Sequence, residues 1–283
     1  MSPTIDAVQA DRELKARHRA MWASGDYNTV VTELITELGQ VLVDRAAVRP
    51  GDHVLDIAAG TGNVAIPAAL AGARVIASDL TPELLAVGRR HAARQGAQVE
   101  WEEADAEALP YADGEYDTVL SCLGVMFAPH HQRAADELVR VCRPGGTIGL
   151  LNWTPEGFIG QLFATMKPFA PPPPPGAQPP PLWGREEHVR ALLADRVIDV
   201  VTERRLLRVE RFHRPEDFRD FFKANYGPTV SVYRALADDP ERVAALDRAL
   251  VELAERFDRG SDSNVLEWEY LVLTARKGDD ARS

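Results

Sequence analysis

The chain has 283 residues, 45% of them hydrophobic and 27% charged, which is enough to bury a full core. Its 43 acidic residues outnumber its 32 basic residues, and the formal net charge is −11. This balance argues against nucleic acids and anionic membranes as partners, because proteins bind both through basic patches. Proline is frequent, with 20 residues, and eight of them lie within residues 171–181.

The chain carries two cysteines, Cys122 and Cys142. They form neither a disulfide framework nor a metal-ligand spacing, so we expect small buried side chains in a reducing compartment. The N-terminal residues are charged by Asp11 and lack the apolar stretch of a signal peptide. No run of about 18 apolar residues is long enough to cross a membrane. These features predict a cytoplasmic protein.

The first half of the chain alternates between helix and strand patterns. Apolar residues at three- and four-residue spacing predict a helix within residues 11–45. Strands are expected at 53–57, 74–78, 99–104, 116–121 and 147–151, and helices at 63–70, 81–95 and 132–142. Alternating strands and helices imply parallel pairing, so the sequence predicts an α/β sheet covered on both faces.

After Trp153 this alternation stops. Residues 158–169 are apolar, and the proline-rich residues 171–181 are expected as polyproline II or an ordered loop. Helices are expected at 185–194, 215–237 and 240–257, and strands at 197–210 and 265–275.

A glycine-rich bend, Gly60-Thr61-Gly62, follows the first strand, and Asp79 ends the second. This spacing fits the loose fingerprint of a dinucleotide site, and a carboxylate at Asp79 can accept bonds from ribose hydroxyls. Asp56, at the end of the first strand, would repel a pyrophosphate. It suits S-adenosylmethionine, which carries an ammonium and a sulfonium but no phosphate. Asp105, after the third strand, can meet an adenine amino group.

Residues 55–62, Leu-Asp-Ile-Ala-Ala-Gly-Thr-Gly, resemble the first motif of class I S-adenosylmethionine-dependent methyltransferases. The similarity is to the branch of ubiquinone and menaquinone biosynthesis methyltransferases, which are methyltransferase type 11-like. Asp79 matches the ribose-binding acid of that family, and residues 103–110 match its adenine-contact segment. Residues 115–119 match its fourth strand, and 138–146 the helix and turn before its fifth. The resemblance spans about residues 50–155 and departs at Ala58, where many members have glycine.

This resemblance implies a Rossmann-like doubly wound fold. Its seven-stranded sheet is mostly parallel with the last strand antiparallel, and residues 197–210 and 265–275 supply strands six and seven. We expect residues 1–45 to form an N-terminal helical lid segment and residues 46–155 the S-adenosylmethionine-binding core. Residues 156–283 would form a C-terminal half with a proline-rich substrate cover at 168–182 and the closing strands.

The resemblance also implies a cofactor site. Its expected residues are Asp56, Ala58, Gly60, Thr61, Gly62, Asp79, Leu80, Asp105, Ala106, Ser121, Leu123 and Tyr27. Leu80, Ala106 and Leu123 would wall the adenine, although such residues are equally common in an ordinary core. Ser121 would lie at the methionine end. No metal is expected, because no His, Asp or Glu cluster shows clear ligand spacing.

Methyl transfer to a hydroxyl benefits from a general base, and histidine is the usual choice near neutral pH. His130 and His131 follow the fourth strand and are the leading candidates, although polar residues are also common before a helix. His18 and His213 are weaker candidates. Tyr27 is a further catalytic candidate, because its hydroxyl can bond near the cofactor carboxylate or the transferred methyl. Substrate contacts are expected from Trp22, Trp153, Phe158 and Tyr226, which equally fit simple packing.

The sequence thus predicts a methyltransferase that acts on a small, fairly hydrophobic metabolite. O-methylation is favoured, and C- and N-methylation stay open. One alternative is a methyltransferase-fold protein that catalyses a non-methylating reaction such as cyclisation. An NAD(P)-dependent oxidoreductase is disfavoured by Asp56 and Asp105. A scaffold protein that acts through its proline run is the remaining alternative.

Overall fold

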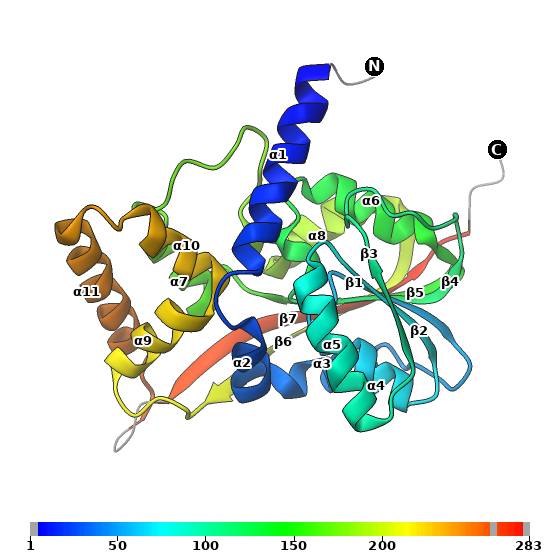
Figure 1. Cartoon of the computed structure of the whole chain (residues 1–283). Helices are drawn as coiled ribbons and strands as arrows, with labels where there is room; N and C mark the ends of the chain where they lie inside the picture. Colours follow the sequence, from blue (N-terminus) through cyan, green and yellow to red (C-terminus); the bar gives the residue numbers. More distant parts are fainter. Residues whose placement is uncertain (1–4, 261–264, 280–283) are drawn as a thin grey trace.

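The computed structural model describes residues 5–260 and 265–279, and its centre is a seven-stranded sheet (Figure 1). The strands are β1 (His53–Ile57), β2 (Arg74–Asp79), β3 (Val99–Glu103), β4 (Tyr116–Cys122), β5 (Cys142–Trp153), β6 (Val197–Val209) and β7 (Leu266–Lys277). Their order is β3-β2-β1-β4-β5-β7-β6, and β7 runs antiparallel to both of its neighbours. The predicted fold class is therefore confirmed. Residues 1–4, 261–264 and 280–283, which belong to the expected lid segment and C-terminal half, lie outside the described residues.

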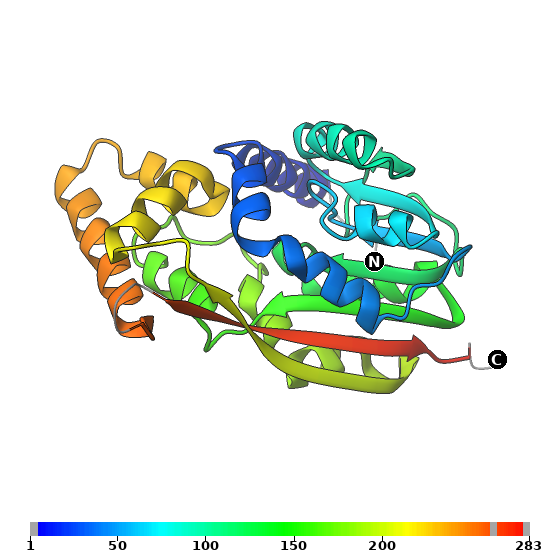
Figure 2. The same ribbon diagram turned by 90° about the horizontal axis from the view of Figure 1, so that it is seen from below.

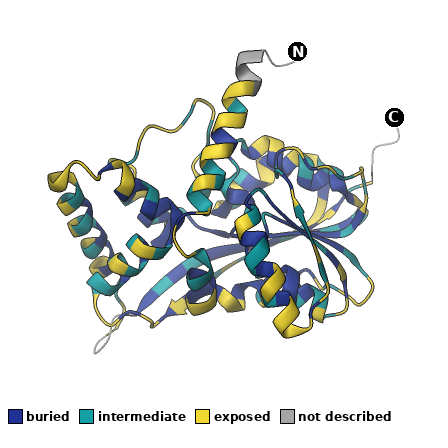
Figure 3. Cartoon of the chain, in the orientation of Figure 1, coloured by how far each residue is buried: buried dark blue, intermediate teal, exposed yellow. Residues whose placement is uncertain are grey.

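Helices cover both faces of this sheet (Figure 2). On one face lie α3 (Thr36–Arg45), α4 (Ala65–Leu70) and α5 (Pro82–Gln95), and on the other α6 (His131–Val141) and α8 (Glu186–Leu193). Short 3₁₀ turns occur at η2 (Val125–Phe127), η3 (Pro180–Gly184) and η4 (Ala194–Arg196). The inner strands are mostly buried, the edge strands β3 and β6 are largely half-buried or exposed, and the helices expose their outer sides (Figure 3).

A helical cap lies at one end of the long strands β6 and β7 (Figure 1). It consists of α7 (Phe158–Met166), α9 (Pro215–Asn225), α10 (Gly227–Ala235) and α11 (Pro240–Phe257). Rings of Phe158, Phe218 and Phe222 from this cap pack with Trp268 of β7. Residues 171–179 connect α7 to η3 and form neither helix nor strand, as predicted for the proline run.

Residues 11–45 are largely helical, as expected, but they do not form one continuous helix. The chain instead forms α1 (Ile5–Trp22), α2 (Tyr27–Val30), a π-helical turn η1 (Val31–Ile35) and α3. Gly25 breaks the helix with a φ of +77°, and Asp26 caps α2 by accepting a bond from the Thr29 amide at 3.2 Å. Glycine and aspartate are turn residues, and here they outweigh the helical periodicity.

The single helix expected at 215–237 is divided into two helices, α9 and α10. Pro228 lies in the first turn of α10 and cannot donate the amide bond that would continue α9. The predicted helix at 240–257 is confirmed residue for residue. None of the described helices is long and apolar enough to span a lipid bilayer.

Candidate active site

A cavity of about 840 Å³ lies at the carboxyl ends of β1, β2, β3 and β4. This edge is where open α/β sheets bind ligands. The sheet contributes Ala58–Thr61, Asp79–Thr81, Ala104–Ala106 and Cys122–Gly124 to its walls. Lys15, His18 and Trp22 of α1 close it from the other side. Figure 1 shows α1 standing between the cap and this part of the sheet.

The bend after β1 is held in shape by Asp79. Its two carboxylate oxygens accept bonds from the amides of Gly60 and Thr81, both at 2.8 Å. Burial raises the pKa of Asp79, and these backbone bonds counteract the rise. A carboxylate has about four acceptor positions, so two remain for ribose hydroxyls. The placement fits the predicted role.

Ala58 adopts a φ of +54°, in the left-handed region that favours glycine. Its carbonyl oxygen lies only 2.3 Å from where a Cβ on Gly124 would stand. The two strand ends β1 and β4 therefore meet without room for another side chain. Gly62 is similarly confined, because a Cβ there would lie 2.5 Å from the Trp101 ring.

Asp56 is not among the described residues that line the cavity. It is 1% exposed, and one oxygen accepts a bond from the Ala65 amide at the start of α4, at 3.0 Å. Burial raises its pKa. Ser121 also lies outside the lining, and its hydroxyl donates to the Ile57 carbonyl at 2.7 Å. Both side chains therefore bond to the backbone near the cavity and do not line it.

Lys15 joins α1 to the segment after β3. Its ammonium lies 3.0 Å from Asp105 and 2.6 Å from Glu107, and its side chain is 11% exposed. Asp105 lines the cavity as predicted, with Leu80 and Ala106 beside it. Sequence reasoning missed Lys15. The available signal was the spacing of Lys15, His18 and Trp22, which places all three on one side of a helix.

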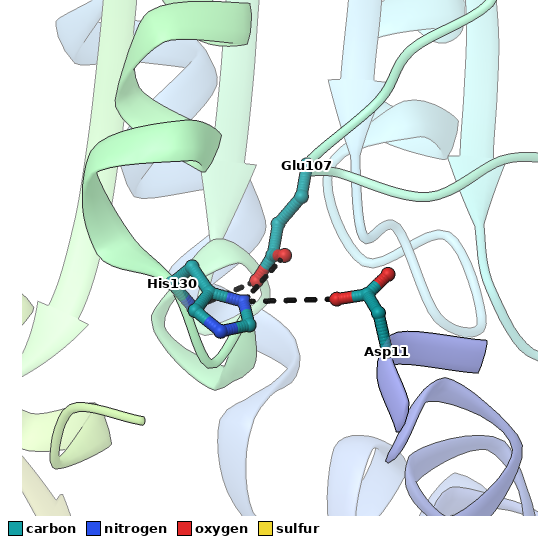
Figure 4. Close-up of side chains that lie close together, drawn as sticks. All are labelled: Asp11, Glu107 and His130. Atoms are coloured by element: carbon teal, nitrogen blue, oxygen red, sulfur yellow. Dashed lines mark hydrogen bonds and ion pairs between the residues drawn. The ribbon is translucent and has the colours of Figure 1, made fainter. Parts of the chain in front are cut away.

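His130 is held by Glu107 and does not line the cavity (Figure 4). The Glu107 carboxylate accepts the His130 amide at 2.7 Å and faces its Nδ1 at 2.9 Å, and Asp11 lies 4.0 Å away. Burial opposes ionisation of Glu107, but the bonds from Lys15 and His130 outweigh it and lower its pKa. These three groups lie close enough to share a metal ion. Both Glu107 oxygens, however, are already engaged by the bonds from Lys15 and His130.

The structure does not bring His131 into the cavity. The side chain is fully buried between α6 and α8, where its Nδ1 lies 2.9 Å from Nε2 of His188 and its ring faces Trp183. Burial lowers the pKa of His131 to about 4. This histidine is therefore a neutral core residue, away from the predicted place of a general base.

His18 is the histidine that lines the cavity. Burial lowers its pKa, and the charges of Lys15 and Arg17 lower it further. The imidazole is therefore neutral near pH 7 and able to accept a proton. His213, the other weak candidate, is exposed at the start of α9.

A smaller aromatic pocket of about 300 Å³ adjoins the cavity. Tyr27, Ile35, Leu123 and Phe127 line both spaces. The far wall of the aromatic pocket includes Trp153, Phe222, Tyr226 and Trp268. The described residues that line it include no charged side chain.

Three of the four predicted substrate residues border these spaces. Trp153 and Tyr226 line the aromatic pocket, and Trp22 lines the cavity with its ring 4.7 Å from Phe127. Phe158 does not, because it is fully buried with its ring stacked 5.7 Å from Trp268. Burial raises the pKa of Tyr27, so its phenol stays protonated as a hydrogen-bond donor.

Several lining residues were not predicted from sequence. They are Lys15, Val31, Ile35, Asn63, Thr81, Leu84, Cys122 and Phe127, with Ala59, Ala104, Gly124, Ala128 and Pro129. Most belong to the lid or to the segment after β4, whose approach to the cavity depends on packing between distant parts of the chain.

The cavity fits S-adenosylmethionine better than a phosphate-containing cofactor. Asp79 and Asp105 supply negative charge, and the one cation among the described lining residues, Lys15, is already paired with carboxylates. Thr61 lines the cavity, and its buried hydroxyl lacks a protein partner. A buried polar atom of this kind is normally satisfied by a ligand or water.

The fold and the cavity fit a class I S-adenosylmethionine-dependent methyltransferase, and the chain carries a methyltransferase domain of this class. The family described as "Methyltransferase domain" matches residues 54–146. S-adenosylmethionine is accordingly its cofactor.

The chain is also similar to individual proteins and to solved structures. It is 52% identical over 275 residues to "Uncharacterized protein Rv1405c" of Mycobacterium tuberculosis, covering 97% of this chain and 99% of that protein. It is 37% identical over 125 residues to demethylmenaquinone methyltransferase of Thermus thermophilus, covering 43% of this chain and 57% of that enzyme. The crystal structure of YcgJ protein from Bacillus subtilis shares the fold, with a TM-score of 0.59 and 16% identity over 86% of this chain and 98% of that one.

Proposed function

We propose that the protein transfers the methyl group of S-adenosylmethionine to an oxygen atom of a small, apolar metabolite. The observation that carries this proposal is the aromatic pocket, which shares Tyr27, Leu123 and Phe127 with the cofactor cavity. An uncharged aromatic wall favours an apolar acceptor, because burying a charge there would be costly. The bound cofactor supplies an electrophilic methyl group, and the protein's task is to align the acceptor with it.

His18 is our proposed general base. It is the histidine of the cavity wall, and its lowered pKa keeps it neutral and able to take the proton of an acceptor hydroxyl. Tyr27 is proposed to orient the acceptor or the cofactor by donating a hydrogen bond. We do not propose His130 or His131 as the base, because neither side chain lines the cavity.

The test is incubation with methyl-labelled S-adenosylmethionine and a panel of apolar phenols and alcohols. We expect label in the products. Conversion of an acceptor without transfer of label would support the alternative of a non-methylating reaction and contradict this proposal. His18→Gln is expected to lower kcat by roughly 10²–10⁴-fold and leave the affinity for S-adenosylhomocysteine unchanged.

The pH profile separates a base from a structural histidine. Because the pKa of His18 is lowered, the rate should hold below pH 6.5 and fall only when the imidazole is protonated at lower pH. A profile of the His18→Gln variant with the same acid limb would contradict the assignment.

We further propose that three parts of the chain have separate roles. Residues 1–45 would form the lid, residues 46–155 the cofactor-binding core, and residues 156–283 the cover over the acceptor. A cytoplasmic location remains a prediction, supported by the free thiols Cys122 and Cys142. Partners other than small molecules are not proposed.

A further inference from the structure

A groove of about 1220 Å³ lies next to the cofactor cavity, on the outer side of α1. It is bordered by α1, α7, α10 and the proline segment, which we define as residues 170–180. His18, Phe127 and Pro129 line both the groove and the cavity. Phe127 also lines the aromatic pocket, so the groove borders the place where the proposed acceptor atom would lie.

The groove has an apolar floor. Phe163 and Met166 of α7, Leu14 and Met21 of α1, and four consecutive prolines of the proline segment contribute to it. This surface suits the hydrocarbon part of a ligand, because apolar groups gain free energy when they leave water.

The charge of the groove is opposite to that of the chain. Arg17 and Lys167 line it, and no aspartate or glutamate is among the described residues that do so. The whole chain carries 43 acidic and 32 basic residues. Neither Arg17 nor Lys167 forms an ion pair with another described residue, although Arg19, two positions along α1, pairs with Glu103 at 2.8 Å. The groove therefore offers two uncommitted positive charges.

The wall of the groove is held in place before a ligand binds. The backbone amide of Gln178 donates to the Pro129 carbonyl at 3.0 Å, and the Arg242 guanidinium donates to the Pro168 carbonyl at 3.1 Å. Proline also fixes the backbone φ, so little conformational entropy is lost when a ligand settles against this segment.

We propose that this groove holds the body of the methyl acceptor, and that the acceptor is an apolar molecule with a carboxylate or similar anionic group. Arg17 and Lys167 bind the anion, and the apolar part extends past Phe127 toward the cofactor. The inference rests on the proposed function only where it names the ligand as the methyl acceptor.

The test compares decanoate with 1-decanol, two probes of equal chain length that differ in charge. Binding is measured by calorimetry on the full chain saturated with S-adenosylhomocysteine. We expect decanoate to bind about tenfold more tightly, the effect of two solvent-exposed charge contacts. The double variant R17Q/K167Q should lose this preference. The matched control R12Q/R234Q removes two exposed arginines from α1 and α10 that do not line the groove, and it should keep the preference.

The outcomes separate the two proposals. Equal binding of the two probes, or loss of the preference in the control variant, overturns the groove assignment. Transfer of labelled methyl to neutral apolar hydroxyl compounds, with no preference for hydroxylated acids, also overturns it and leaves the proposed function intact. A carboxylate preference that depends on Arg17 and Lys167, without methyl transfer to any hydroxyl compound, charged or neutral, supports the ligand class and contradicts the proposed function.

Discussion

Replacing Asp79 with asparagine tests the cofactor site at the residue that connects it to the fold. The wild-type carboxylate accepts the amides of Gly60 and Thr81 and retains two acceptor positions for ribose hydroxyls. An asparagine keeps one oxygen and turns its NH₂ group toward one of the two amide donors. The variant therefore loses a charged acceptor and gains a donor facing a donor.

The size of the effect follows from these bonds. A hydrogen bond to a charged group contributes about 1.5–3 kcal/mol, and an unsatisfied buried donor costs about 1–3 kcal/mol. Only the first affects binding, because the second is present with and without ligand, and it predicts a rise of roughly 10–10²-fold in the Kd for S-adenosylhomocysteine. The ligand-free protein should lose about 1–3 kcal/mol of stability, because one backbone amide is left facing the asparagine NH₂ group.

Isothermal titration with S-adenosylhomocysteine measures the first effect, and thermal unfolding without ligand measures the second. Asp52→Asn is the matched control, because its carboxylate also accepts a backbone amide, that of Arg49 at 2.8 Å, in the turn before β1. A Kd for Asp79→Asn within about threefold of the wild type would refute the assignment.

Three further predictions concern other parts of the site. His131 has a pKa lowered to about 4, so its contribution to stability is present above the usual imidazole pKa and is lost as the pH falls from about 6.5 toward 4. His131→Leu should flatten this acid limb in urea unfolding, and an unchanged slope would contradict it. Gly124→Ala places a Cβ 2.3 Å from the Ala58 carbonyl, and should lower the free energy of unfolding by about 1–3 kcal/mol and weaken S-adenosylhomocysteine binding. Replacing residues 171–175 with glycine and serine should weaken acceptor binding more than cofactor binding, and the reverse result would count against a substrate cover.

The part of the site nearest the glycine bend was predictable from sequence. Gly60, Thr61 and Asp79 lie close together because the strand-turn-helix connection of β1 to α4 and its pairing with β2 fix them. Local motif spacing carries this information, and so it also placed Asp105 and Ala106 at the end of β3.

The side chains that α1 and α6 contribute were not predictable in the same way. His131 and His18 are both helical residues, and which side of a helix faces the cavity depends on how that helix packs. The turn at Gly25 and Asp26 directs α1 back across the sheet, and only that arrangement brings Lys15 to Asp105. Phe158 shows a related limit, because an apolar residue fits a substrate wall and a core equally well.

Trp268 contributes both to the shape of the proposed acceptor pocket and to the stability of the fold. It lines the aromatic pocket, and its ring also packs against Trp153, Phe158 and Phe222 at 5.7, 5.7 and 5.8 Å. Enlarging the pocket by truncating it would cost about 3–5 kcal/mol, a large share of the roughly 5–15 kcal/mol by which most domains are stable. A change of acceptor preference is therefore easier to obtain by substitutions at Tyr226 or in the proline segment than at Trp268 of β7. Trp268 contributes to both the shape of the pocket and the stability of the fold.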